Sequence, residues 1–106
     1  MMFDLLPAHL VDELLVERIR QFEKFGDQSN VPDGTGGLAA IEDARLSRLS
    51  CQAAFKDGAG TWKDILEEEF CEAMAESNVE MLRAELIQVA AVACAWIKVL
   101  DKRGAL

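Results

Sequence analysis

Several residue types are absent or rare in this chain, and each absence narrows the chemistry it can carry. The 106 residues contain no tyrosine, one histidine and three cysteines. Cys51, Cys71 and Cys94 are widely spaced and form no CxxC pair, so with His9 as the single histidine we expect no zinc site. We interpret Cys71 and Cys94, which fall in helical patterns, as small core residues.

Long apolar runs and an excess of basic residues are also missing. The longest apolar stretch, 89–97, is far shorter than the roughly 18 residues of a membrane helix. The start, Met1-Met2-Phe3-Asp4, lacks the basic flank and cleavage pattern of a signal peptide. A net charge of −8 repels nucleic acid polymers and anionic membranes, but not a small nucleotide whose phosphates meet cations. We therefore expect a cytoplasmic protein without a membrane or polymeric nucleic acid partner.

The hydrophobic content of 51% predicts a folded chain, and we expect residues 1–106 to form a single helical domain. Apolar residues recur at helical spacing, strict alternation is absent and β-branched residues are few, so the pattern predicts an all-α fold resembling a four-helix bundle. A segment rich in turn formers, 27–37, separates the first two helices. The expected helices span residues 9–25, 38–56, 61–76 and 77–102.

Capping patterns mark the starts of the last two helices. Thr61 has Asp64 three residues on, and Ser77 has Glu80 at the same spacing. The break between these helices is short, which predicts antiparallel neighbours. Between residues 84 and 97 only Glu85 and Gln88 are polar, so the last helix needs covering on all sides. This indicates a homo-oligomer, unless its alanines simply tolerate partial exposure.

The most informative residues are acids placed among apolar positions of the last two helices. At 100° per residue, Glu72 lies about 60° from Glu69, in a sector that also holds apolar side chains. Glu85 shares a stripe with Val89, Val92 and Trp96. Inward carboxylates are costly unless they are paired or bind a cation. The pattern indicates an oxygen-rich site for Mg²⁺ or Mn²⁺ formed by Glu69, Glu72, Glu85 and Gln88; the alternative is a solvated acidic face.

The order Glu68-Glu69-x-x-Glu72, a gap of 12 residues, and Glu85-x-x-Gln88 resembles the EExxE…ExxD signature of MazG-like all-α nucleoside triphosphate pyrophosphohydrolases. The flanking segments add to the resemblance, which covers nearly the whole chain. They are the residues from Glu17 to Gln28, the Pro32-Asp33-Gly34-Thr35-Gly36 loop, Trp62, and the run 82–93.

The resemblance implies hydrolysis of a nucleoside triphosphate between its α and β phosphates, giving a monophosphate and pyrophosphate. It also implies that Glu69, Glu72 and Glu85 are metal ligands. The sequence departs from the signature at Gln88, where the family has aspartate; an amide oxygen can coordinate Mg²⁺, but it is neutral and cannot act as a base. We expect attack of water on phosphorus, with Glu68 or Glu72 as the catalytic proton acceptor.

Cations and aromatic residues are candidates for contact with the substrate. The resemblance favours Lys24, whereas Arg45, Arg48 and Arg83 are better explained as charges on helix surfaces, with Arg83 kept as a candidate. Trp62 is a candidate for stacking on a base, the alternative being a core position. The segment 33–37 lacks both the GK[ST] ending and the preceding strand of a phosphate-binding loop.

We therefore expect a Mg²⁺-dependent enzyme, a dimer or tetramer, that removes unwanted nucleotides or adjusts nucleotide pools. dUTP hydrolysis or phosphoribosyl-ATP cleavage on the same architecture is the second possibility within the enzyme class. The alternative from another class is a non-catalytic helical nucleotide-binding or assembly protein, in which Gln88 marks a decayed metal site.

Overall fold

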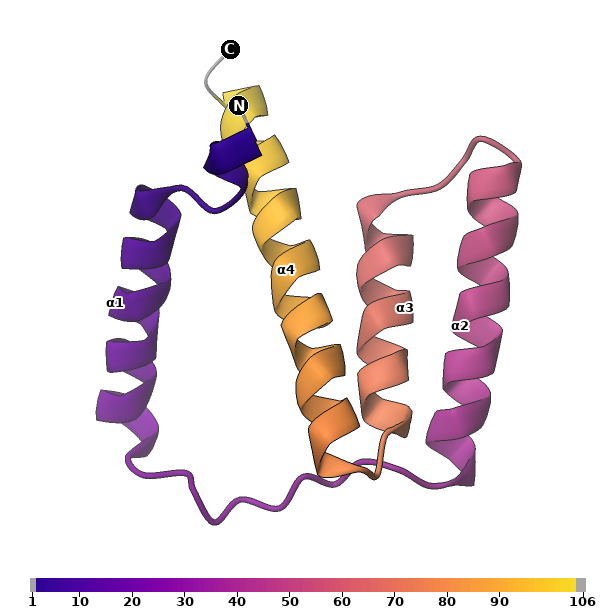
Figure 1. Ribbon diagram of the computed structural model, residues 1–106, viewed down its shortest axis with the longest axis horizontal. Helices are drawn as coiled ribbons and strands as arrows, with labels where there is room; N and C mark the ends of the chain where they lie inside the picture. The colour runs from indigo at the N-terminus through magenta and orange to yellow at the C-terminus, as the bar shows by residue number, and fades with distance from the viewer. Residues whose placement is uncertain (1, 105–106) are drawn as a thin grey trace. The chain divides into compact units, whose positions relative to one another are not determined.

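The computed structural model describes the backbone of residues 2–104 and is helical throughout its regular parts (Figure 1). A short 3-10 helix, η1 (Met2–Leu5), precedes four α-helices, and the described residues contain no strand. The all-α prediction is therefore confirmed. Contacts between residues divide the chain into two units, Met1–Asp33 and Gly34–Leu106, which are described separately below.

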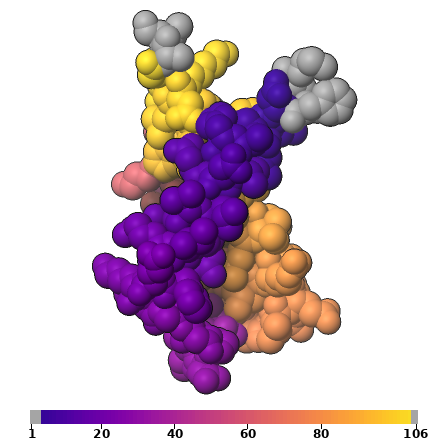
Figure 2. Space-filling model, turned by 90° about the vertical axis from the view of Figure 1, so that its left-hand side faces the viewer, coloured from indigo at the N-terminus to yellow at the C-terminus, as the bar shows by residue number. Residues whose placement is uncertain are grey.

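The first unit contains η1 and α1 (Ala8–Phe25), which begins one residue before the predicted start. Pro7 precedes α1 and fits there, because the first turn of a helix leaves its N–H groups without partners in any case. The helix ends at Gly26, whose N–H donates to the Phe22 carbonyl at 2.7 Å and whose φ of 68° favours glycine. Figure 2 shows the side chains of α1, in indigo to purple, following one another as a continuous rod.

The second unit is built from α2 (Leu38–Lys56), α3 (Trp62–Ala75) and α4 (Val79–Gly104). Helix α3 lies between the other two and contacts both, and successive helices run in opposite directions (Figure 1). The residues buried in this unit are mostly small: Ala44, Cys51, Ala73 and Leu82. Small side chains let the helix axes approach closely, so that longer side chains meet between them. These contacts involve three helices, and the predicted four-helix bundle stays a prediction.

The connection from α2 to α3 follows the expected turn and cap chemistry. A Cβ atom added to Gly60 would clash with the ring of Phe55, so glycine lets this ring lie against the backbone. Thr61 then caps α3: its hydroxyl accepts from the Asp64 N–H, and the Asp64 carboxylate accepts from the Thr61 N–H at 3.0 Å. The capping box predicted at this position is confirmed.

The turn from α3 to α4 differs from the prediction in one respect. Helix α4 begins at Val79, and the Asn78 side-chain oxygen accepts from the Met81 N–H at 3.0 Å. The cap is therefore Asn78, and the prediction of Ser77 as the capping residue was wrong. Both residues are good caps, and the backbone that leaves Glu76 in an extended conformation places the later one at the helix start.

The segment before α2 is fastened to this turn. The Gly36 N–H donates to the Met74 carbonyl at 2.8 Å, and a Cβ at Gly36 would lie 3.2 Å from the Cβ of Ser77. With a φ of +87°, Gly36 also has a backbone conformation that other residues rarely adopt. In the part of the chain described, no helix is both long enough and apolar enough to cross a membrane.

Candidate metal centre

Three carboxylates converge where α3 faces α4. Glu69 and Glu72 lie one turn apart on α3, and Glu85 lies on α4, the next helix in the chain. Each contributes an oxygen within 4.8 Å of the oxygens of the other two. Helical spacing explains the first pair, and the short antiparallel turn brings Glu85 opposite them. The structure thus brings together three of the four residues predicted as metal ligands.

Two carboxylate oxygens of this cluster are buried and accept no hydrogen bond from the residues described. Glu69 Oε2 and Glu85 Oε2 are both buried, and neither has a hydrogen-bond partner among the residues described. A buried acceptor without a donor costs roughly 1–3 kcal/mol, and more when it carries charge. The arrangement is therefore unfavourable for three ionised carboxylates on their own.

The proton affinities of the cluster reflect this environment. Burial raises the pKa of the Glu69 carboxyl above its usual value, and the charges of Glu72, Glu85 and Glu68 add to the effect. The pKa of Glu72 is also raised, by burial first and then by Glu68 and Glu85. Arg48 acts in the opposite direction on Glu72. A cation placed among the three carboxylates would favour their ionised forms and so act against both shifts.

The donor set fits a hard divalent cation. Carboxylate oxygens are the ligands that Mg²⁺ and Mn²⁺ prefer, and Mg²⁺ commonly takes one or two carboxylates together with waters and substrate phosphates. The two buried oxygens without donors are the atoms that such an ion would satisfy.

Two further predicted residues border this cluster. Gln88 lies three residues after Glu85 on α4 and is exposed, so its predicted role as a ligand stays a prediction. Glu68 is half-buried beside Cys51 of α2: burial first, and then hydrogen bonding and charge from Glu68, raise the pKa of the Cys51 thiol to about 11. The predicted catalytic role of Glu68 or Glu72 likewise stays a prediction.

Arg48, which we interpreted from the sequence as a charge on a helix surface, pairs with this cluster. Arg48 of α2 places its Nε 3.5 Å from Glu72 Oε1, with the two side chains 50% and 21% exposed. Arg45, one turn earlier, pairs instead with Glu42 of its own helix at 2.6 Å. The spacing on α2 gave no way to choose between them, because the choice depends on how α2 is rotated against α3.

The candidates for substrate contact lie at different places. Arg83 is exposed and precedes Glu85 by two residues, which places it about 200° around α4 from that ligand. Lys24 belongs to the first unit, where its Nζ lies 5.2 Å from the centre of the Phe25 ring. For both residues the predicted contact with substrate stays a prediction.

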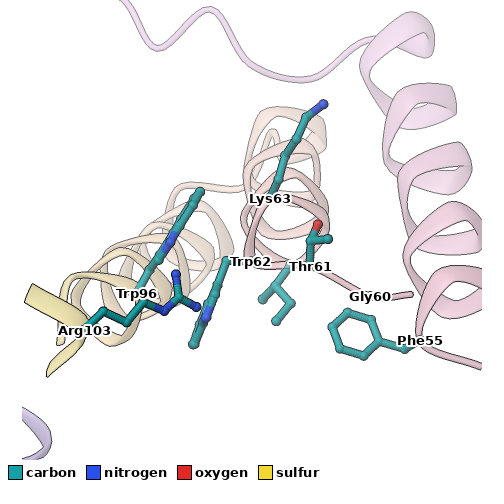
Figure 3. A pocket seen from close by; sticks show the side chains of 8 residues that line it. Phe55, Gly60, Thr61, Trp62, Lys63, Trp96 and Arg103 are labelled. Atoms are coloured by element: carbon teal, nitrogen blue, oxygen red, sulfur yellow. The ribbon is translucent and has the colours of Figure 1, made fainter. Parts of the chain in front are cut away.

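Trp62 forms an aromatic pair with Trp96. The two ring centroids are 6.4 Å apart and the rings lie 12° from parallel. They border a cavity of about 510 Å³ beside the start of α3, and Figure 3 shows the Arg103 side chain extending toward the two indoles. The sequence left open whether Trp62 stacks on a base or occupies a core position, and here its stacking partner is an indole of α4.

We compared the chain with known proteins in three ways. No protein-family model, no curated protein and no solved structure matched it. The interpretation of the site therefore depends on its own geometry and on the motif spacing described above.

Proposed function

We propose that this protein is a Mg²⁺-dependent nucleoside triphosphate pyrophosphohydrolase that cleaves between the α and β phosphates. The observation that carries the proposal is the convergence of Glu69, Glu72 and Glu85, with two buried oxygens that lack donors. Their spacing along the chain resembles the acid signature of MazG-like enzymes, which supports a phosphate substrate over another use of the ion.

In this proposal the three glutamates hold the ion and Gln88 contributes its amide oxygen. A bound divalent ion would neutralise phosphate charge and lower the pKa of a coordinated water. Glu72 is the first candidate for the base, through a carboxylate oxygen that does not hold the ion. Glu68 is the second candidate for the base. Lys24, Arg83 and Trp62 are proposed to contact the substrate.

We also propose that the protein is cytoplasmic and self-associates into a dimer or tetramer, which would complete a helical bundle. Large apolar side chains on α3 and α4 support self-association, because Phe70, Leu86, Ile87 and Leu100 are all between 45% and 56% exposed. Exposed apolar surface of this extent is typical of interaction sites. Sedimentation equilibrium would test it, and a monomer at micromolar concentration would contradict it.

The enzymatic proposal is tested with a panel of normal and modified (d)NTPs in the presence of Mg²⁺ or Mn²⁺. We expect release of a monophosphate and pyrophosphate that depends on the ion. Orthophosphate as the first product would contradict cleavage between the α and β phosphates. Absence of any product, together with absent Mg²⁺ binding in calorimetry, would remove the proposal altogether.

The second candidate is a non-catalytic nucleotide-binding or assembly protein. One observation favours it: the predicted fourth ligand is a neutral amide, Gln88, at an exposed position. The Gln88→Asp variant separates the two candidates. If Gln88 faces the ion, the added carboxylate tightens Mg²⁺ binding with the fold retained; unchanged affinity counts against this residue as a ligand.

A further inference from the structure

A groove lies between α2 and the glutamate cluster. Its volume is about 530 Å³, within the usual range for pockets that hold small ligands. Its walls carry charge of both signs: Arg45 and Arg48 come from α2, Glu72 and Glu85 come from α3 and α4, and Glu76 directly follows α3. We call this space the arginine groove. It opens directly onto two of the three glutamates of the candidate metal centre.

The two arginines of the groove differ in how they are engaged. Arg45 donates through Nε and Nη2 to both carboxylate oxygens of Glu42, at 2.9 and 2.6 Å. Arg48 has a single long ion pair, 3.5 Å, with Glu72, a candidate ligand of the metal. A two-point pair holds its guanidinium in place, whereas a half-exposed arginine at 3.5 Å is easily redirected.

Glu72, the ion-pair partner of Arg48, is also a candidate ligand of the divalent ion. Without an ion, Arg48 offsets one of the three converging negative charges through its ion pair with Glu72. Once the Glu72 carboxylate is shared with a divalent ion, the attraction that holds Arg48 falls. The guanidinium then has its N–H donors free within the groove, and their planar fork matches the oxygens of a phosphate group.

We propose that Arg48 is an exchangeable counter-ion: it neutralises Glu72 in the metal-free protein and binds a phosphate oxygen of the substrate in the metal-bound protein. The inference rests on the proposed function and assigns the β and γ phosphates, which become the leaving pyrophosphate, to the arginine groove. Arg48 binds and positions the phosphates in this proposal, whereas the glutamates and their ion would hold the reacting water. Arg45, whose guanidinium is paired with Glu42, contributes less to phosphate binding.

This assignment predicts effects of opposite sign from one substitution. Arg48→Gln removes a cation that competes for Glu72, so Mg²⁺ should bind about threefold more tightly when no phosphate is present. The same variant loses the charged hydrogen bonds to phosphate, so pyrophosphate should bind about tenfold more weakly in saturating Mg²⁺. A residue that merely supports the fold would weaken both.

Titration calorimetry on the full chain measures both constants, with Mg²⁺ alone and then with inorganic pyrophosphate. Arg48→Lys keeps the charge but loses the fork, so we expect unchanged Mg²⁺ affinity and intermediate pyrophosphate affinity. Lys56→Gln removes the same charge from the exposed end of α2, outside the groove, and should change neither. Thermal unfolding followed by circular dichroism checks that each variant is folded.

The outcomes separate this inference from the proposed function. If the wild-type chain binds Mg²⁺ and pyrophosphate but Arg48→Gln leaves both affinities unchanged, or weakens both, the role of Arg48 is refuted and the hydrolase proposal stands. If the wild-type chain binds neither, both are refuted. Tighter Mg²⁺ binding together with weaker pyrophosphate binding, absent in Lys56→Gln, supports the exchange.

Discussion

Glu17 in the first unit and the glutamate cluster in the second are acidic sites of opposite kinds. In the first, Glu17 accepts hydrogen bonds from Arg20 at 2.8 and 2.5 Å, and this pairing lowers the pKa of its carboxyl. In the second, burial and neighbouring acids raise the pKa of Glu69 and Glu72. The ionised form of glutamate is therefore favoured at position 17 and disfavoured at positions 69 and 72. The presence of a charged residue therefore does not identify a functional site. A charged residue whose surroundings disfavour its ionised form is the better indicator.

The largest effect is expected from removing the charge at position 69. Glu69→Gln should reduce Mg²⁺ binding and pyrophosphate release by about 100-fold or more, because a carboxylate ligand becomes a neutral amide. Without metal, the same variant should be more stable than wild type by about 1 kcal/mol, because the repulsion and the buried unpartnered charge are removed.

The matched control is Glu17→Gln in the first unit, which should leave metal binding unchanged and should not raise stability, since its carboxylate is already paired. Calorimetry and urea unfolding give both quantities. The contrast between the units would be broken if Glu69→Gln destabilised the metal-free protein or if the two variants behaved alike.

A second prediction concerns the tight connection within the second unit. Gly60→Ala places a methyl group against the Phe55 ring and should cost about 2 kcal/mol of unfolding free energy. Gly104→Ala is the control, because an added Cβ there meets nothing within 4 Å. Urea denaturation compares the two variants. Equal stabilities would mean that the ring of Phe55 moves aside without cost.

The third prediction concerns Cys51, the buried cysteine of α2. With its pKa raised to about 11, Cys51 has little thiolate at pH 8, and we expect alkylation by iodoacetamide at least tenfold slower than in the urea-unfolded chain. Mass spectrometry of quenched samples gives the rate at each cysteine. Equal rates in the folded and unfolded chain would show that the thiol is neither buried nor perturbed.

The same shift sets a pH dependence of stability. The folded-state pKa lies above the ordinary value of 9.0, so the contribution of the protonated thiol is fully present below pH 9 and is lost as the pH rises through 11. Stability measured between pH 8 and 11 should fall for this reason. In Cys51→Ala this part of the decline should be absent, and an unchanged slope would assign it to other groups.

A smaller effect is expected at the start of α4. Asn78→Ala removes the side-chain acceptor for the Met81 N–H and should cost about 1 kcal/mol. Ser77→Ala, one residue earlier, should be nearly neutral, because its hydroxyl does not cap the helix. Thermal unfolding of both variants tests this, and the reverse order would restore Ser77 as the cap.

The sequence predicted the second unit well where local rules decide. Helix α2 has the predicted bounds, and the Thr61–Asp64 capping box was recognised because its two residues lie only three positions apart in the chain. The meeting of Glu69, Glu72 and Glu85 followed from helical spacing and one short turn. Each of these features needs only neighbouring residues or a single antiparallel pair.

Features that depend on the rotation of one helix against another were not predicted. The choice of Arg48 over Arg45 as the partner of Glu72 depends on which face α2 turns toward α3. The stacking of Trp62 on Trp96 joins residues 34 positions apart on two helices. Apolar periodicity gives the buried stripe of each helix but not its register against a neighbour.

One backbone contact has a consequence for how the chain can be altered. The hydrogen bond from Gly36 to Met74 fixes the path of the main chain just before α2, within the unit that holds the glutamates. Additional residues introduced between Gly26 and Gly34 therefore lie upstream of that fastening point. Such insertions should leave divalent-ion affinity as it is, which calorimetry can check. The loop before α2 can thus be lengthened while the backbone that carries the ion-binding glutamates keeps its own point of attachment.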